Sequence, residues 1–211
     1  MDEPNYSFNK DEKKFEKAPN PPAGGDASGK KEDGGLGEIL RFAIIAILIV
    51  LPIRIFIAQP FIVSGTSMIP TFEDGEYIIV DQLSYRLHDA RRGDVIIFKY
   101  PKDTSKYFIK RVIGLPGETV TVAGNNVSIT KNGETDSFTL TEPYVKHDGA
   151  ENVTAILKSD EYYVLGDNRA SSLDSRYWGP LNEKYLTGRA YMRLLPVSKL
   201  DFLPGVFNFE N

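Results

Sequence analysis

The apolar stretch over residues 39–58 restricts what this chain can fold into. Its longest run without a charged residue covers residues 42–53, between Arg41 and Arg54. A membrane-spanning helix usually needs ~20 apolar residues, and arginines near its ends can extend their guanidinium groups to the lipid headgroups. The stretch is apolar on all sides, whereas a buried helix of a globular domain normally keeps a polar face. It therefore predicts a single membrane anchor over residues 38–59.

A cleaved secretory signal is a second explanation of this stretch, and it fits less well. Such a signal begins with a short basic segment, whereas residues 1–37 carry mixed charge, and no Ala-x-Ala site follows the stretch. Lys and Arg close to a span mark its cytoplasmic side. Lys30, Lys31 and Arg41 come before the uninterrupted apolar run, and the first basic residue after Arg54 is Arg86. We therefore expect a single-pass type II protein of the cell membrane, with a cytoplasmic N-terminus and residues 60–211 extracytoplasmic.

The composition of the chain excludes several classes of protein. Residues 1–37 are rich in charged residues, Gly, Pro and Asn without apolar periodicity, so we predict a disordered cytoplasmic tail. The net charge of −4 argues against nucleic acid as a partner. The chain has no cysteine and only 2 histidines, so we expect no disulfide, no metal site and no organic cofactor.

Beyond residue 59 the sequence changes to short apolar runs separated by turn residues. Runs of this kind predict β-strands, and Asn132-Gly133 is a typical hairpin turn. Only residues 82–90 have a weak helical pattern. We therefore predict a mainly β, monomeric protein, with an antiparallel β-sheet catalytic domain over residues 60–211 on a single N-terminal transmembrane helix. The predicted strands are residues 77–80, 94–100, 107–113, 119–122, 127–130 and 161–165.

Residues 61–71, directly after the apolar stretch, combine features expected around a nucleophile. Small residues, among them Ser64 and Ser67, let another backbone approach closely. A serine at such a position acts as a nucleophile only when another residue takes its proton. His88 and His147 lie in polar, charged surroundings that favour ordinary surface positions. Neither histidine is therefore a strong candidate for the base.

Lys110 is the better candidate for the base. In an extended strand over residues 107–113, its side chain shares a face with Phe108 and Val112. Burial can lower the pKa of a lysine from ~10.4 by as much as ~3–5, so that a neutral amine is available near pH 7. A lysine on an edge strand would instead keep its charge in water. The local pattern leaves both possibilities open.

Four motifs occur in a fixed order along the chain. Together with the apolar stretch they make it resemble, over roughly residues 38–196, the bacterial type I signal peptidases, the serine–lysine leader peptidases of the cell membrane. The motifs are Ser-Gly-Thr-Ser-Met-Ile-Pro-Thr from Ser64, Arg-Gly-Asp-Val-Ile-Ile-Phe from Arg92, Phe-Ile-Lys-Arg-Val-Ile-Gly-Leu-Pro-Gly-Glu from Phe108 and Gly-Asp-Asn-Arg-Ala-Ser-Ser-Leu-Asp-Ser-Arg-Tyr-Trp-Gly from Gly166.

The resemblance implies a role for each matching position. Ser67 corresponds to the nucleophile and Lys110 to the general base. Ser64 corresponds to the residue whose hydroxyl joins the Ser67 backbone N–H in the oxyanion hole. Ser172 corresponds to the serine that hydrogen-bonds and orients the lysine amine. Residues that would support the last loop are Gly166, Asp167, Asp174 and Arg176.

The resemblance also implies a substrate. The family cleaves N-terminal signal peptides from exported preproteins, with small residues at positions −1 and −3. An extended substrate can pair with strand edges, so apolar residues beside Ser67 and Lys110 are expected to line its subsites. The partners expected are therefore signal peptides and the lipid bilayer. The expected substrate-binding residues are Ile62, Val63, Met68, Tyr107 and Ile109.

Two other classes remain as alternatives. Self-cleaving repressors of the same fold also use Ser and Lys, but they would carry a DNA-binding domain where this chain has its tail and apolar stretch. A membrane-tethered β module without enzymatic activity would have a Lys110 of ordinary basicity. Cleavage of a preprotein, compared between the wild type and Ser67→Ala, separates these classes from a signal peptidase.

Overall fold

The computed structural model describes residues 35–56, 58–146, 149 and 151–209. The predicted tail lies outside the described residues up to residue 34. The apolar stretch forms the helix α1 (Gly35–Phe56), of 22 residues, and every side chain described in it, at residues 37–50, is exposed. Within the described residues, no helix is both long enough and apolar enough to cross a membrane. The chain divides into two units, and the boundary falls inside α1, between Phe42 and Ala43.

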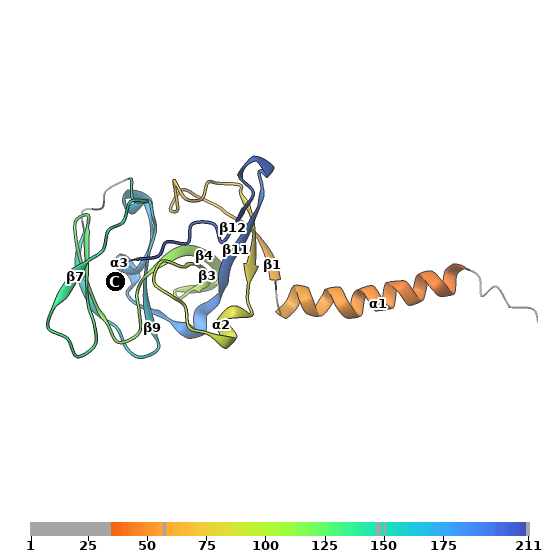
Figure 1. The fold of residues 1–211 in the computed structure, drawn as a ribbon, viewed down its shortest axis with the longest axis horizontal. Coiled ribbons are helices and arrows are strands. Elements are labelled where there is room, and N and C mark those ends of the chain that lie inside the picture. The colour runs from red at the N-terminus through yellow and green to blue at the C-terminus, as the bar shows by residue number, and fades with distance from the viewer. Residues whose placement is uncertain (1–34, 57, 147–148, 150, 210–211) are drawn as a thin grey trace, which may run out of the picture. The chain divides into compact units, whose positions relative to one another are not determined.

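The larger sheet contains eight antiparallel strands. Seven of them follow the order β1-β2-β11-β3-β4-β9-β10, and β12 pairs with β11 (Figure 1). This confirms the mainly β, antiparallel fold predicted from the sequence. The strands are β1 (Ala58–Ile62), β2 (Tyr77–Asp81), β3 (Val95–Tyr100), β4 (Asp103–Gly114), β9 (Glu161–Leu165), β10 (Leu181–Asn182), β11 (Leu186–Leu195) and β12 (Asp201–Phe202).

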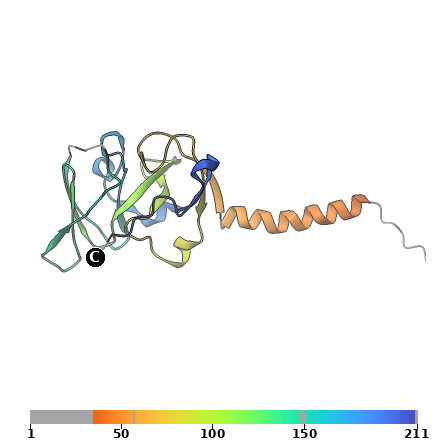
Figure 2. The ribbon, with the colours of Figure 1, turned by 45° about the horizontal axis from the view of Figure 1, so that its top comes forward.

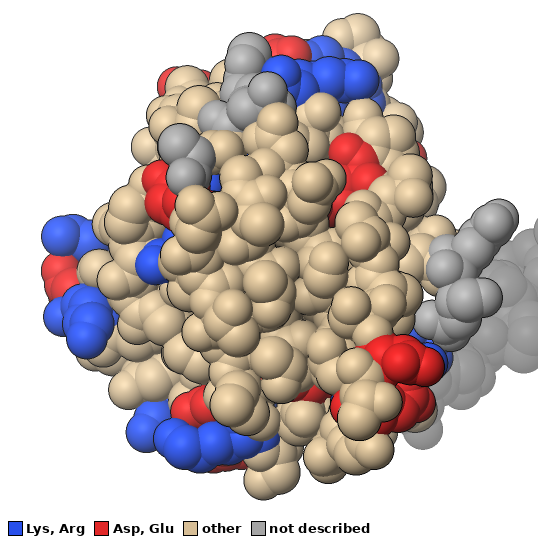
Figure 3. All heavy atoms as spheres, turned by 90° about the vertical axis from the view of Figure 1, so that its left-hand side faces the viewer, with Lys and Arg blue, Asp and Glu red and all other residues tan. Residues whose placement is uncertain are grey.

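A smaller, four-stranded sheet has the order β7-β6-β5-β8. It lies at one end of the β region, beyond β9 (Figures 1 and 2). Figure 3 looks at this end: charged side chains gather around the rim, and the centre carries few. Threonine and serine hydroxyls pair across the strands, such as Thr121 with Thr154 and Ser128 with Thr139. The strands are β5 (Thr119–Ala123), β6 (Asn126–Thr130), β7 (Ser137–Thr139) and β8 (Asn152–Ile156).

Side-chain alternation along the strands divides the interior into clusters. On β3, Ile97 packs into one cluster with Val63 and Met68, while its neighbour Ile96 packs on the opposite face with Val112. A strand places successive side chains on opposite faces, so one buried strand serves both. A third cluster of buried aliphatic side chains joins β9 to the small sheet. β3 and β4 are thereby packed on both sides, and β4 is held as a rigid support for Lys110.

The helical segments after α1 are short. The helix predicted over residues 82–90 is confined to α2 (Ser84–Leu87). The α-helix α3 (Ser175–Trp178) was not predicted; it is one turn long, so no apolar periodicity can develop. The strands β7, β8, β10, β11 and β12 were also not predicted. The remaining helical turns are the 3₁₀ segments η1 (Arg169–Ser171), η2 (Glu183–Tyr185) and η3 (Val197–Lys199).

Candidate active site

The loop between β1 and β2, here called the nucleophile loop (residues 63–76), carries Ser64 and Ser67. Its two ends are tied together, because the Val63 N–H donates to the Glu76 carbonyl at 2.9 Å and the Gly75 N–H donates to the Val63 carbonyl at 2.9 Å. Met68 is 1% exposed and Phe72 is fully buried, so both anchor the loop in the core. The loop is therefore held at its ends and from below, while Ser67 stays partly accessible.

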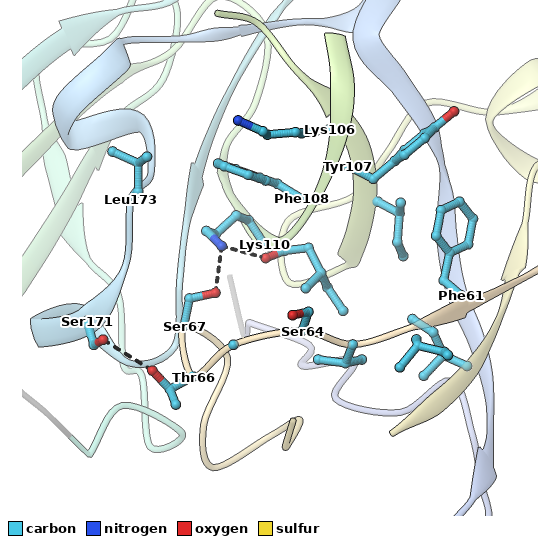
Figure 4. A pocket seen from close by; sticks show the side chains of 16 residues that line it. Phe61, Ser64, Thr66, Ser67, Lys106, Tyr107, Phe108, Lys110, Ser171 and Leu173 are labelled. Atoms are coloured by element: carbon cyan, nitrogen blue, oxygen red, sulfur yellow. Dashed lines mark hydrogen bonds between the residues drawn. The ribbon is translucent and has the colours of Figure 1, made fainter. Parts of the chain in front are cut away.

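Lys110 lies on β4 and points at Ser67 (Figure 4). Its Nζ donates to the Ser67 Oγ at 2.7 Å and to the Ile109 carbonyl at 2.8 Å. The lysine is only 4% exposed, and its Nζ lies 5.3 Å from the centre of the Phe108 ring. Of the two possibilities for Lys110, the structure shows the buried one. The residue predicted as base and the residue predicted as nucleophile are in direct contact.

Burial lowers the pKa of Lys110 from its ordinary value of 10.5 to about 8. The cause is desolvation, because a charged amine loses hydration when it is enclosed by apolar groups. The negative charges of Asp174 and Asp167 act in the opposite direction but do not outweigh burial. Among the described residues no carboxylate forms an ion pair with Lys110. A substantial fraction of the amine is therefore neutral slightly above neutral pH.

The segment after β9 holds the nucleophile loop in place. The Asn168 N–H donates to the Ser67 carbonyl at 3.0 Å, and the Asn168 side-chain amide donates to the Thr66 carbonyl at 3.1 Å. A Cβ at Gly166 would overlap both the Ser172 hydroxyl and the Ser67 carbonyl oxygen. Glycine is therefore required at this position by close approach of the two loops. Sequence reasoning did not single out Asn168, although it lies inside the fourth motif.

Asp167 is held by Arg111, the residue after Lys110. The Arg111 Nε donates to the Asp167 Oδ1 at 2.8 Å and the Nη2 to the Oδ2 at 2.6 Å, with both side chains 1% exposed. The guanidinium carbon also lies 3.9 Å from the centre of the Tyr144 ring. Strand alternation places Arg111 on the face opposite Lys110, but the sequence gives no sign of its partner. A pairing of this kind joins residues that are far apart in the chain.

Asp174 and Arg176 form a second buried ion pair. The Arg176 Nε donates to the Asp174 Oδ1 at 2.8 Å, and Asp174 also accepts the backbone N–H of Gly166 at 3.0 Å. Asp174 caps the start of α3 by accepting from the Arg176 N–H, as N-cap aspartates commonly do. The four residues predicted to support this loop are therefore linked to one another or to β4.

Ser172 and Ser64 differ in their surroundings. The Ser172 hydroxyl is buried beside Gly166 and has no hydrogen-bond partner among the described residues. The hydrogen bond predicted between Ser172 and the Lys110 amine is thus not formed, because the amine is turned toward Ser67 and the Ile109 carbonyl. Ser64 is exposed and faces the cleft next to Ser67 (Figure 4).

A cleft of about 500 Å³ opens over the Ser67–Lys110 contact. Four of the five residues predicted to bind substrate line it: Ile62, Val63, Tyr107 and Ile109. Met68 does not line the cleft. Its side chain is buried in the core cluster that also contains Phe72. Residues of the lining that sequence reasoning did not assign include Phe61, Lys106, Phe108 and Leu173.

Of the two histidines, the structure describes His88. His88 is an exposed residue at the end of α2 and does not line the cleft. His147 lies outside the described residues. Among the described residues, the side chains predicted as nucleophile and base that meet in the cleft are Ser67 and Lys110.

Comparison with known proteins gives a consistent assignment. Residues 36–195 match the family model described as signal peptidase, peptidase S26. A signal peptidase I of Leptolyngbya laminosa is 38% identical over 87% of this chain and 91% of its own length. A probable signal peptidase I-1 of Synechocystis sp. is 36% identical over 82% of this chain and 88% of its own length. A crystal structure of a signal peptidase I from Enterococcus faecalis is 28% identical and covers 48% of this chain and 97% of its own, with a TM-score of 0.41.

The chain belongs to the S26 family of signal peptidases, as a bacterial type I member. It is therefore a serine peptidase, and the self-cleaving repressor and the non-enzymatic β module raised by the sequence are set aside.

Proposed function

We propose that this protein removes N-terminal signal peptides from exported preproteins, with Ser67 as nucleophile and Lys110 as general base. The observation that carries the proposal is the 2.7 Å contact between the Lys110 Nζ and the Ser67 Oγ at a buried lysine. A nucleophile and its base must be within hydrogen-bonding distance, and this pair meets that requirement.

The first step is attack of Ser67 on the carbonyl carbon of the scissile peptide bond. Neutral Lys110 takes the proton of the Ser67 hydroxyl as the Oγ–carbon bond forms. The lowered pKa of about 8 supports this role, because a lysine with ordinary basicity would be almost fully protonated at neutral pH. The Ile109 carbonyl accepts a hydrogen bond from the amine and so fixes its direction.

The carbonyl oxygen becomes negatively charged during this attack and needs hydrogen-bond donors. The Ser67 backbone N–H and the Ser64 hydroxyl are the proposed donors. Both belong to the nucleophile loop, and neither donates a hydrogen bond to another described residue. One such donor contributes ~3–4 kcal/mol to the stabilisation of the transition state in comparable sites.

Lys110 also serves the second half of the reaction. Its ammonium group gives the proton to the leaving amine as the C–N bond breaks, which leaves an ester between Ser67 and the signal peptide. The neutral amine then takes a proton from water, and the resulting attack on the ester releases the signal peptide and restores Ser67. Ser172 is proposed to orient the amine once the Ser67 Oγ has become part of the ester.

The apolar half of the cleft is proposed to bind the residues before the scissile bond. Ile62 and Val63 on one side and Tyr107 and Ile109 on the other form its walls. The small residues that the family resemblance implies at positions −1 and −3 are proposed to bind between these walls. The exposed edge of β1 offers backbone groups for pairing with an extended substrate.

We also propose that α1 attaches the enzyme to the cytoplasmic membrane. The support is the apolar sequence of residues 39–58 and the exposure of large apolar side chains on α1, such as Phe42 at 71% and Leu48 at 68%. A helix of 22 residues extends over ~33 Å, comparable to a hydrocarbon core. Residues 1–37 would then be the cytoplasmic tail, and residues 60–211 the extracytoplasmic catalytic domain.

The test is cleavage of a preprotein by the full-length protein in detergent or vesicles. Ser67→Ala and Lys110→Met are each expected to lower kcat/KM by at least ~10³-fold, because each removes a group that makes or accepts a bond in the reaction. Ser105→Ala and Lys102→Met are matched controls at exposed positions near β4, and they should cleave at the wild-type rate. Wild-type cleavage by Lys110→Met would contradict the dyad.

A further inference from the structure

The Ser67–Lys110 contact divides the cleft into two halves of different character (Figure 4). One half is apolar and contains Phe61 and Tyr107, whose rings meet edge to face at 5.1 Å. The other half lies on the opposite side of Lys110, where Lys106 and Phe108 face Leu173 across the opening. This second half is here called the Lys106 side of the cleft.

The Lys106 side is where we expect the substrate segment after the scissile bond, whose amine is the leaving group of the first step. This step rests on the proposed function. If the signal peptide occupies the apolar half and its carbonyl oxygen points to Ser64, the chain after the scissile bond must continue past Lys110. Lys110 has to reach the leaving amine, so the new N-terminus starts at its Nζ. From there an extended chain advances ~3.3 Å per residue, which places roughly the first three residues of the mature protein on the Lys106 side.

The charged side chains that line the cleft are basic, and the acidic Asp103 lies beside Lys106. Among the described residues that line the cleft, the charged side chains are Lys106 and Lys110, and none is acidic. The Lys106 side chain is 66% exposed and its ammonium lies 3.0 Å from the Asp103 carboxylate, itself 40% exposed. An ammonium group has three donors, so this contact leaves others for a substrate.

Leu173 gives the same region an apolar wall. It is 48% exposed and comes from the loop that follows η1, so it faces Lys106 from a different part of the chain. A side chain entering between them meets a methyl-bearing surface on one side and a positive charge on the other. Aspartate and glutamate combine a short aliphatic stem with a negative charge and suit both.

We propose that Lys106 is a specificity-determining residue that makes the enzyme favour acidic residues at the start of the mature protein. The ligand is thus the substrate segment after the scissile bond, and its recognised feature is a carboxylate within the first three residues. Because Lys106 is exposed, the preference is modest and falls with salt; exposed ion pairs correspond to roughly twofold to fivefold effects.

Asp103 limits this preference. Its carboxylate accepts a hydrogen bond from the Ser105 hydroxyl at 2.6 Å and forms an ion pair with Lys106 in the free enzyme. A substrate carboxylate must share or replace that contact. Asp103→Asn is therefore expected to increase the preference for acidic substrates, whereas Lys106→Glu is expected to reverse it toward basic ones.

The experiment measures kcat/KM for one preprotein carrying Asp, Asn or Lys at each of the first three mature positions in turn. Wild type, Lys106→Glu, Lys106→Met and the exposed control Lys102→Glu are compared at low and high salt. In the wild type, Asp should be favoured over Lys by about threefold to tenfold at one or more positions. Lys106→Met should lose this ratio, Lys106→Glu should invert it, and Lys102→Glu should keep it.

The ratio between substrates separates this inference from the proposed function. Wild-type cleavage with the same Asp-to-Lys ratio in all four proteins would overturn the role of Lys106 and leave the dyad intact. A ratio that changes equally in Lys102→Glu would show a general field effect and would also overturn it. Failure of the wild type to cleave any of the substrates would instead contradict the proposed function.

Discussion

Lys110 and Arg111 are neighbours on β4, and both are buried, yet their pKa values are shifted in opposite directions. Lys110 faces the cleft and meets a serine hydroxyl and a backbone carbonyl. Arg111 faces the other side and meets a carboxylate with two hydrogen bonds. Burial lowers the pKa of Lys110 to about 8. Burial also acts to lower the pKa of Arg111, but the hydrogen bonds and charge of Asp167 outweigh it and the pKa is raised.

The comparison shows that the pKa of a buried basic residue depends on whether a carboxylate is paired with it. The carboxylates whose charges act on Lys110 are those of Asp174 and Asp167, and each forms an ion pair with an arginine. A carboxylate beside Lys110 that had no arginine partner would stabilise the charged form of the amine. Both acids are thus paired with arginines, and among the described residues neither forms an ion pair with Lys110.

The largest expected effect comes from breaking the ion pair between Arg111 and Asp167. Arg111→Met leaves Asp167 buried without its partner and should lower the free energy of unfolding by about 3–5 kcal/mol. Thermal unfolding of the full-length protein measures this loss. A double variant, Arg111→Met with Asp167→Leu, removes both charges and should recover part of the stability. Equal stability of single and double variants would mean that the pair is not what holds this region.

Lys110 is expected to control the pH dependence of catalysis. Only neutral Lys110 can take the Ser67 proton, so kcat/KM should rise about tenfold per pH unit below the pKa of about 8 and level off above it. The measurement is a pH–rate profile on a substrate without a titrating group. A limb that continues to rise toward pH 10.5, the ordinary lysine value, would show that burial does not tune this amine.

Removing the buried charge should stabilise the protein while it abolishes cleavage. The folded-state pKa of Lys110 lies below the unfolded value, so the cost of burying the charge is fully present below about pH 8 and disappears as pH rises toward 10.5. Lys110→Met should therefore raise the free energy of unfolding by roughly 1–3 kcal/mol at pH 7. The gain over wild type should vanish near pH 10.5. Destabilisation at pH 7 would contradict the asymmetry between Lys110 and Arg111.

The smallest expected effect concerns Ser172. Its buried hydroxyl has no partner in the free enzyme, so Ser172→Ala should leave stability unchanged or raise it by up to about 1 kcal/mol. If the hydroxyl orients Lys110 during the reaction, kcat falls by about tenfold with little change in KM. Ser137→Ala, at an exposed serine of β7 outside the cleft, is the control. An unchanged kcat would remove Ser172 from the proposed site.

Local sequence patterns were sufficient where a residue's role depends on its neighbours in the chain. Apolar runs bounded by turn residues predicted six of the twelve strands in the described residues, among them β3, β4 and β9. Period-2 alternation correctly separated Lys110 from Arg111. The strand β11 was missed because its sequence mixes Gly188, Arg189 and Arg193 with apolar residues, and it becomes a strand by pairing with both β2 and β3. Pairing of that kind is a tertiary property.

By itself, the sequence determined the mainly β class, the apolar stretch at the N-terminus and the four motifs that name the family. Only the tertiary structure decided that Lys110 is buried and touches Ser67, that Asp167 belongs to Arg111, and that Met68 is core and not cleft. The physical reason is that a pKa depends on desolvation and on charges brought near by folding. Those distances join residues from β4, the nucleophile loop and the loop after β9, and no local pattern encodes them.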